Sequence, residues 1–370
     1  MNMRRIFLIL LPLLLTACTR AENETSDLTR LKLPDGFHIA VFAQAPSARM
    51  MVFSPGGALL VSEPDEGKVV ALPDPQHAGK AERSVDVFTG LTEPHGLAFY
   101  KGNLYIAENG RVRSYDWDEA SLKASNPKAL ADLPGRGGHS TRTVIFHNDK
   151  MYVSAGSSCN VCIEKDPRRA AVMEFNADGS GMKIFAKGLR NAVGMAVNPK
   201  TDTIWVTVNG RDRLGDDIPP ETIYDLGESG GDAGWPYCYG DRVPDREFTK
   251  PGDDRCQSVM RPKVQMQAHS APLGLAFYEA SVFPQAYRNN IFVAFHGSWN
   301  RSVPTGAKIV RVKLDDKGQP VGGAEDFITG WQNASGKRWG RPVGIVFGAD
   351  GAMYVSDDMA GLIYRVTYGK

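Results

Sequence analysis

The sequence has no excess of charge of either sign. Its 370 residues include 43 lysines and arginines and 42 aspartates and glutamates, so the formal net charge is +1. Such a balance provides no basic surface that would attract nucleic acid or anionic lipid. We therefore expect the chain to bind a small molecule or another protein, and no nucleic acid.

Long hydrophobic runs are absent after the N-terminal segment. Arg4 and Arg5 precede residues 6–15, which are apolar apart from Pro12. This run is too short to span a bilayer and is typical of the central region of a signal peptide.

The run ends in the sequence Leu15-Thr16-Ala17-Cys18, which resembles the lipobox of bacterial lipoproteins. We expect a lipoprotein signal peptide over residues 1–17, cleavage before a lipid-modified Cys18, and a polar tether over residues 18–30. Thr19 in place of Asp favours a periplasmic protein anchored to the outer membrane, with the lipid as its only membrane attachment. The alternative is an ordinary signal peptide with an accidental cysteine.

Cysteines are few, and they are consistent with export. The sequence has five, and a lipid on Cys18 leaves an even number for an oxidising compartment, namely Cys159, Cys162, Cys238 and Cys256. Three pairings are possible, and we favour the most local one, Cys159–Cys162 with Cys238–Cys256. Ile163 stands where haem attachment would need histidine, and the other two cysteines lack the spacing of a second zinc ligand pair.

No segment after residue 20 has the pattern of a long amphipathic helix. The apolar residues instead form short alternating runs with the period of strands. One unit, an apolar strand followed by a turn and a second strand rich in Tyr and Val, occurs six times. The first strands of these copies end at residues 53, 99, 146, 197, 277 and 347.

The spacing of the copies predicts the fold. The first three steps match the length of a four-stranded propeller blade, and the last two are longer, which indicates insertions. We therefore predict an all-β, six-bladed β-propeller over residues 31–370. Residues 37–42 would form the outer strand of the last blade, so that they close the ring and hide two sheet edges.

Polar and cationic residues stand just before the inner strands. Equivalent positions of successive blades meet at the propeller axis, so these side chains should line one pocket: His95, His139, Arg142, Arg190, Asn191, His269 and Arg341. Arginines gathered at a channel mouth suit a polyanionic ligand, because they pair with carboxylates in bidentate geometry.

Several motifs follow one another in an order that resembles a known family. They are residues 188–196 (GLRNAVGMA), 209–212 (NGRD), 215–217 (GDD) and 230–236 (GGDAGWP), together with residues 138–142 (GHSTR) and 296–301 (HGSWNR). This succession is similar to the soluble quinoprotein glucose dehydrogenases, and more closely to their sorbosone and aldose sugar dehydrogenase branch. The resemblance covers residues 32–368.

The resemblance implies pyrroloquinoline quinone, a planar tricarboxylate, and calcium as cofactors. Arg190 and Arg341 would bind the quinone carboxylates, and Asn191 would donate to the quinone oxygens. The backbone carbonyls of Gly210 and Arg211 would hold calcium, which prefers oxygen ligands. The other residues expected at the cofactor are Arg142, Trp299 and Arg301, although the loop that carries Trp299 could instead be folded over its own tryptophan.

The same resemblance implies the reaction. A sugar, or a sugar-like alcohol or aldehyde, would lose hydride to the quinone while His139 takes the hydroxyl proton as general base. Because the sequence has no haem or iron–sulfur motif, an external acceptor, a quinone or a cytochrome, would receive the electrons. Two alternatives remain: a calcium-dependent lactonase propeller, and a non-catalytic binding propeller of the cell envelope.

Overall fold

The computed structural model of the protein describes residues 28–135 and 137–369. The predicted signal peptide and the predicted lipid-modified Cys18 lie outside the described residues, as does most of the predicted tether. Leu28, the first residue described, packs against a buried core cluster, so the chain joins the folded body slightly before residue 31. Within the described residues no helix has both the length and the apolar character needed to cross a membrane.

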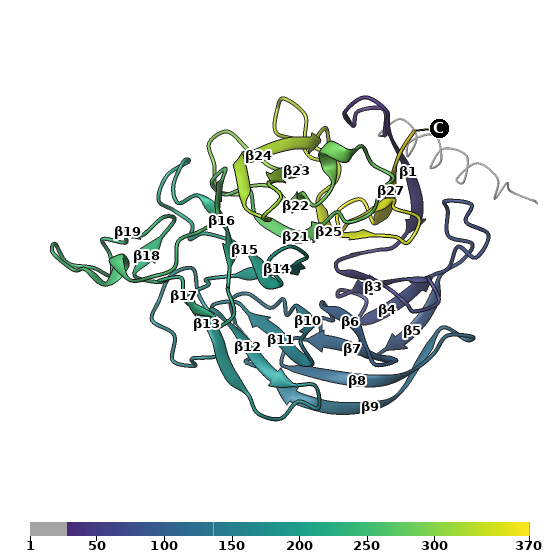
Figure 1. Cartoon of the computed structure of the whole chain (residues 1–370), viewed down its shortest axis with the longest axis horizontal. Helices are drawn as coiled ribbons and strands as arrows, with labels where there is room; N and C mark the ends of the chain where they lie inside the picture. Colours follow the sequence, from purple (N-terminus) through teal and green to yellow (C-terminus); the bar gives the residue numbers. More distant parts are fainter. Residues whose placement is uncertain (1–27, 136, 370) are drawn as a thin grey trace, which may run out of the picture.

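Six sheets stand around one axis, as the repeats predict (Figure 1). The first blade contains β2 (Met51–Phe53), β3 (Leu59–Glu63), β4 (Lys68–Leu72) and β5 (Val85–Thr89). The second contains β6 (Leu97–Tyr100), β7 (Asn103–Glu108), β8 (Arg111–Asp118) and β9 (Lys123–Asp132). The third contains β10 (Val144–His147), β11 (Lys150–Ala155), β12 (Ala171–Asn176) and β13 (Lys183–Lys187).

The remaining blades follow the same antiparallel order. The fourth contains β14 (Ala192–Asn198), β15 (Thr203–Val208), β16 (Glu221–Asp225) and β20 (Val264–Met266). The fifth contains β21 (Pro272–Phe277), β22 (Ile291–Phe295), β23 (Lys308–Leu314) and β24 (Pro320–Ile328), with the short 3-10 helix η2 (Gln285–Tyr287) between its first two strands. The sixth contains β25 (Pro342–Phe347), β26 (Met353–Asp357) and β27 (Leu362–Tyr368). The predicted six-bladed propeller is confirmed.

The ring closes in the sixth blade, where the N-terminal strand β1 (Phe37–Gln44) pairs with β27. Phe37 lies opposite Tyr368, and its ring contacts three further aromatic rings edge to edge, those of Phe283, Tyr287 and Phe327. The predicted outer strand is therefore confirmed, and burial of these rings seals the junction between the fifth and sixth blades.

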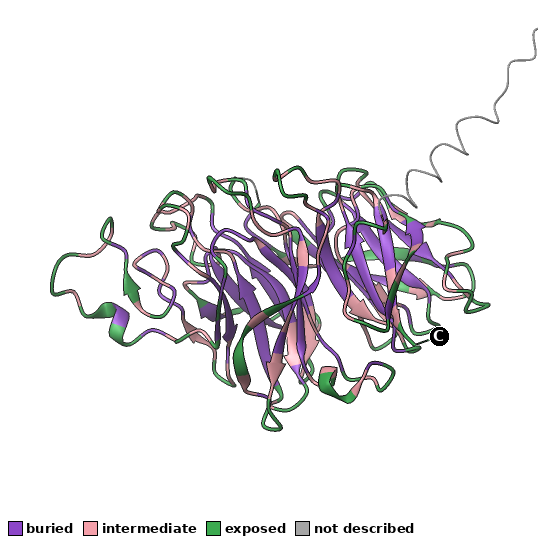
Figure 2. Ribbon diagram, turned by 90° about the horizontal axis from the view of Figure 1, so that it is seen from above, coloured by how far each residue is buried: buried purple, intermediate pink, exposed green. Residues whose placement is uncertain are grey.

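The long step between the fourth and fifth copies is an insertion of two parts. Its first part, β17 (Gly231–Asp232), adds a parallel fifth strand to the third blade beside β13, which the sequence did not predict. Its second part, which we call the arm (residues 237–259), contains β18 (Cys238–Tyr239), β19 (Val243–Pro244) and the 3-10 helix η1 (Arg255–Gln257), and it protrudes from the ring (Figure 2). A disulfide, Cys238–Cys256, holds the arm together.

Both predicted disulfides are present, because the structure also joins Cys159 to Cys162. The Cys159–Cys162 bridge closes a loop of the third blade between β11 and β12. Glu164 lies close enough to both sulfurs for a metal site, but the sulfurs are bonded to each other and supply no thiolate ligands.

Candidate cofactor and active site

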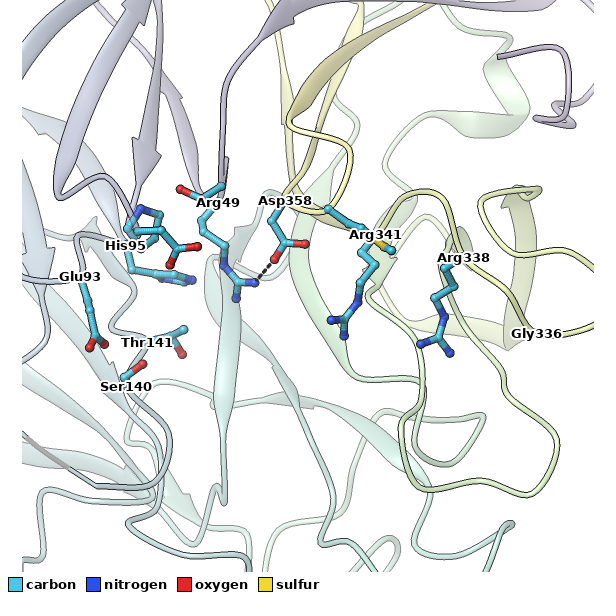
Figure 3. A pocket seen from close by; sticks show the side chains of 13 residues that line it. Arg49, Glu93, His95, Ser140, Thr141, Gly336, Arg338, Arg341 and Asp358 are labelled. Atoms are coloured by element: carbon cyan, nitrogen blue, oxygen red, sulfur yellow. Dashed lines mark hydrogen bonds and ion pairs between the residues drawn. The ribbon is translucent and has the colours of Figure 1, made fainter. Parts of the chain in front are cut away.

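A pocket with a volume of about 1030 Å³ opens at the end of the axis where the inner strands begin (Figure 3). Loops that precede β2, β6, β10 and β25, together with those that follow β3 and β26, form its wall, which includes Arg49, Asp65, Glu93, His95, Ser140, Thr141, Arg338, Arg341 and Asp358. The blades therefore bring residues that are distant in sequence to one mouth, as the repeat pattern predicts.

Three arginines, Arg49, Arg338 and Arg341, and three carboxylates, Asp65, Glu93 and Asp358, line this pocket, and not all of the arginine donors are paired. Arg49 forms an ion pair of 2.7 Å with Asp358. Arg341 uses its Nε to donate to the carbonyl of His296, at 3.1 Å, and its two Nη atoms have no hydrogen-bond partner among the described residues. Burial lowers the pKa of Arg341 from its usual value, and the nearby Arg49 adds to this effect. An anion in the pocket would relieve the cost of burying these charges.

Asp358 is the carboxylate that partly balances the arginines. His296 Nε2 lies 2.9 Å from both of its oxygens. Burial alone would raise the pKa of Asp358, but the contacts with His296 and Arg49 outweigh burial and lower the pKa to about 2. The carboxylate is therefore ionised at neutral pH and fixes both partners.

Arg49 and Asp358 were missed in the sequence, although Arg49 carries a usable signal. It stands two residues before β2, just as His95 and Arg142 stand two residues before β6 and β10. The pre-strand rule therefore applies to the first blade as well. Asp358 follows the inner hairpin of the sixth blade, and no repeat position identifies it.

His139 lies beside the pocket, directly before the lining residues Ser140 and Thr141. Its Nδ1 is 3.0 Å from both the carbonyl and the hydroxyl of Ser157. The carbonyl can only accept, and the Ser157 hydroxyl already donates its proton to the carbonyl of Cys159, at 2.7 Å. We therefore assign the proton to Nδ1, which leaves the lone pair on Nε2. Nε2 has no partner among the described residues and could accept a proton.

Two glycines allow this packing. Gly138 has a φ of +63°, and a Cβ there would lie 2.3 Å from the carbonyl oxygen of Ser157. A Cβ on Gly156 would lie 2.5 Å from Asn191 Oδ1 and 2.6 Å from His139 Cβ. Larger residues would force the His139 loop away from the third blade, and Gly156 is the reason that His139 and Asn191 can approach each other.

The environment of His139 keeps its ring neutral. Burial, followed by the positive charges of Arg190, Arg142 and Arg169, lowers its pKa to about 4. A histidine with such a pKa is uncharged throughout the neutral range and can act as a base there.

Arg190 is held by its neighbours more firmly than the sequence indicates. Its Nε donates to the carbonyl of Asn160, its Nη1 to the carbonyl of Asn209, and its Nη2 to Asn160 Oδ1 and Asp212 Oδ2. Four of its five N–H groups are therefore used, and one on Nη1 has no partner among the described residues. Arg190 does not line the Arg341 pocket but a smaller cavity that also contains Gly210 and Arg211. The charge of Arg190 is partly balanced by Asp212, at 3.2 Å.

Arg142 does not face the pocket, contrary to the expectation that it binds the cofactor. It is 0% exposed, and its guanidinium donates to the carbonyls of Pro134, His139 and Thr141. Its two Nη groups thus hold the loop that carries His139, its buried Nε has no partner among the described residues, and Arg142 is not part of the pocket wall.

The loop expected to hold calcium is tied to its surroundings on both sides. The backbone N–H of Gly210 donates to Glu221 at 2.7 Å, and the side chain of Arg211 forms ion pairs with Asp245 and Glu247 of the arm. Burial raises the pKa of Glu221 to about 7. The side chain of Arg211 is thus anchored away in the arm, so only backbone carbonyls of this pair remain as possible ligands.

The loop of residues 296–305 connects β22 to β23 in the fifth blade and contacts loops of the fourth and sixth blades. Arg338 donates to the carbonyl of Ser298 at 2.7 Å, and Asn300 donates to Asp212 at 3.0 Å. The guanidinium of Arg301 contacts the carbonyl of Asp216. This loop therefore links the Arg341 pocket to the Arg190 network, with Arg301 acting as one of its fasteners.

Trp299, in the same loop, is 68% exposed. The loop is thus not folded over its own tryptophan, and no described contact places that ring against the pocket. Its predicted contact with the cofactor stays a prediction. His269, another pre-strand residue, supports the neighbouring loop by hydrogen bonds to the carbonyls of Gly215 and Ile218.

The residues present fit a planar polycarboxylate. The free Nη groups of Arg341 and the remaining N–H of Arg190 are suitable donors for carboxylates. Two buried polar atoms near the mouth, Asn191 Oδ1 and His95 Nε2, have no hydrogen-bond partner. Both atoms are acceptors, because the Nδ1 of His95 faces the carbonyl of Arg142, so a water or a ligand hydroxyl would satisfy them, whereas a carboxylate would not.

The fold and this pocket define a six-bladed propeller with a site for a polyanionic cofactor. The chain belongs to the TrAA12-like family, whose model matches residues 31–369. The predicted relationship to the pyrroloquinoline quinone-dependent sugar dehydrogenases is thereby confirmed, whereas the predicted preference for sorbosone stays a prediction.

Two relatives and one solved structure illustrate the relationship. The pyrroloquinoline quinone-dependent sugar dehydrogenase of Hypocrea jecorina is 24% identical over 97% of this chain and 95% of its own. The pyrroloquinoline quinone-dependent pyranose dehydrogenase of Coprinopsis cinerea is 26% identical over 91% of this chain, which spans 54% of that longer protein. The holo structure of the quinone domain of the Coprinopsis enzyme has the same fold, with a TM-score of 0.78, 24% identity, and coverage of 91% of this chain and 97% of that domain.

The assignment of His139 can be tested in the protein alone. We expect ¹⁵N NMR of the imidazole to show the proton on Nδ1, and a titration midpoint near pH 4, because burial and Arg190 disfavour the charged ring. Arg190→Ala should raise the midpoint by removing one of the repelling charges. A wild-type midpoint of 6 or above would contradict the buried, neutral base.

Proposed function

We propose that this protein oxidises an aldose, or a related sugar alcohol or aldehyde, with pyrroloquinoline quinone and calcium, and passes the electrons to an external quinone or cytochrome. The observation that carries the proposal is the pairing of a neutral histidine, whose Nε2 is free, with a mouth lined by incompletely paired arginines. The names of the relatives support the same reaction class.

The arginines would bind the cofactor by its carboxylates. Arg341 has the most unused donors, so we expect it to contribute the strongest charge-assisted hydrogen bonds, with Arg190 adding one N–H from its fixed network. The amide of Asn191 lies beside His139 and would contact the quinone oxygens. When bound, the quinone accepts a hydride from the sugar carbon, a reaction that calcium assists by polarising the quinone carbonyl.

His139 would remove the proton of the sugar hydroxyl. Its Nδ1–H is fixed by Ser157, so the proton would arrive at Nε2. The imidazolium so formed lies near Arg190 and Arg142, whose charges favour rapid loss of the proton to solvent. The protein thus keeps the base neutral before the step and disfavours its accumulation as a cation afterwards.

Calcium would be held by the carbonyls of Gly210 and Arg211, as the family resemblance implies. Glu221 and the ion pairs of Arg211 support the backbone of this loop without entering the site. The family commonly has proline where this chain has Arg211, and the ion pairs with the arm supply the rigidity that proline would give.

Arg341→Ala should weaken quinone binding. Removing a charge-assisted pair costs about 1.5–3 kcal/mol, so we expect the Kd to rise by about 10-fold to 150-fold in a fluorescence titration with calcium present. Arg311→Ala is the control, because Arg311 pairs with Glu325 on the outer strands of the fifth blade and should leave the Kd unchanged. Equal affinity of Arg341→Ala and wild type would contradict the assigned carboxylate site.

His139→Ala should bind quinone with near-normal affinity and lose about 10²–10⁴ in turnover, the share of a general base. Saturating quinone should not restore the rate with any member of an aldose panel. In the wild type, kcat should be constant from pH 7 to about 5 and fall as pH drops through the His139 pKa of about 4, because only the neutral ring accepts a proton. Normal turnover of His139→Ala would show that another residue is the general base.

We also propose a periplasmic location, with the mature protein anchored to the outer membrane through a lipid on Cys18. The support is the lipobox at residues 15–18 and the even number of remaining cysteines, all of which form disulfides. Intact-mass spectrometry of the native protein should show a diacylglyceryl cysteine at the N-terminus, and Cys18→Ser should abolish membrane association. An unmodified N-terminus at another residue would contradict the anchor.

A further inference from the structure

We propose that the disulfide loop, residues 159–162, is a positioning clamp that fixes Arg190 through Asn160 and fixes the tautomer of His139 through Ser157. This inference rests on the proposed function, in which Arg190 binds the cofactor and His139 is the base; the same loop would support both residues. The clamp residues are positioning residues and do not themselves contact substrate.

Asn160 grips Arg190 at two of its nitrogens. The carbonyl of Asn160 accepts from Nε at 2.8 Å, and its side-chain Oδ1 accepts from Nη2 at 2.9 Å. The same side chain pairs with the backbone of Asp212, since Oδ1 accepts from its N–H at 2.8 Å and Nδ2 donates to its carbonyl at 3.2 Å. One asparagine therefore locks both Arg190 and the carboxylate that balances it.

The other end of the loop reaches His139. The carbonyl of Cys159 accepts the proton of the Ser157 hydroxyl at 2.7 Å. That hydroxyl is then left only with lone pairs for His139 Nδ1, 3.0 Å away. If Cys159 moved, the Ser157 hydroxyl could donate to Nδ1 and compete with the Ser157 carbonyl, which accepts from Nδ1–H at 3.0 Å. The preference for the Nδ1–H form, in which Nε2 acts as the base, would then weaken.

The loop is restrained by the hydrogen bonds of Asn160 and Cys159 and, covalently, by the disulfide. It belongs to no strand, Asn160 and Val161 are only half-buried, and Ile163 directly after it is 64% exposed. Glu164 binds the N–H and hydroxyl of Ser158, which restrains one side. The covalent bridge between Cys159 and Cys162 thus adds a restraint on the backbone of the two residues between them, beyond the hydrogen bonds of Asn160 to Arg190 and Asp212.

The second disulfide of the chain provides a matched control. The bridge Cys238–Cys256 spans 18 positions, against three for Cys159–Cys162. Because the stabilisation by a disulfide increases with the length of the loop it closes, the Cys238→Ala/Cys256→Ala pair should lower Tm more than the Cys159→Ala/Cys162→Ala pair. For quinone binding and turnover we expect the opposite order, with the larger loss in the Cys159→Ala/Cys162→Ala variant.

We expect Cys159→Ala/Cys162→Ala to raise the quinone Kd about tenfold or more and to lower kcat at saturating quinone. In the apo-protein its His139 midpoint should move from about 4 toward 6.5, with loss of the single Nδ1–H form in ¹⁵N NMR. Cys238→Ala/Cys256→Ala should keep the Kd and kcat within about twofold and leave the His139 signals unchanged.

Asn160→Ala keeps both disulfides and separates the effect of the loop on Arg190 from its effect on His139. It should weaken quinone binding while leaving the His139 tautomer intact, and Asn160→Asp, which retains an acceptor for Arg190, should recover part of the affinity. This variant also carries the test if the Cys159→Ala/Cys162→Ala protein does not fold.

Two outcomes would overturn the clamp: a folded Cys159→Ala/Cys162→Ala protein with unchanged Kd and unchanged His139 signals, or an Asn160→Ala protein with wild-type affinity. Failure of the proposed function is distinguishable, since a wild-type protein that binds no quinone would refute that function. The NMR readout, which needs no cofactor, would still decide whether the loop sets His139.

Discussion

Pairing of β1 with β27 is the interaction on which the rest of the molecule depends. It joins residues more than 300 positions apart and turns six sheets, each with a free edge, into a closed ring. Closure fixes the distance of every inner strand from the axis, and the loops before those strands must then meet at one mouth. Arg49, His95, Thr141 and Arg341 line one pocket for this reason, although no two of them come from the same blade.

Positive charges at and beside that mouth have two effects. Burial and mutual repulsion make Arg341 and its neighbours costly without a ligand, which favours any anion that pairs with them. Burial, followed by the charges of a second group of arginines, Arg190, Arg142 and Arg169, lowers the pKa of His139 to about 4 and keeps the ring neutral. Arg190 is the one member of this group that is also expected to bind the cofactor, so its replacement should change both properties, whereas replacement of Arg341 should change affinity alone.

Much of this architecture could be predicted from the sequence, because the length and number of the repeats indicate the kind and number of blades. The period of the paired strands gave six blades, residues 37–42 gave the closing strand, and local spacing gave both disulfides. Side-chain direction could not be predicted in the same way: Arg142 occupies a pre-strand position yet points into backbone carbonyls. Contacts between loops were also inaccessible, since the grip of Asn160 on Arg190 and the fastening of Arg301 to Asp216 join segments that no repeat relates.

The ring closure also determines which connections of the chain are dispensable. Phe37 and Tyr368 are paired neighbours on adjacent strands, and paired residues in an antiparallel sheet have Cα atoms about 5 Å apart. A few added residues could therefore join these two ends, and new ends could be opened at an exposed turn such as the one at Asp316 and Lys317 between β23 and β24. Such a circular permutant would retain all six sheets and every loop at the mouth. The geometry of the site therefore depends on closure of the ring and not on the position of the chain termini within it.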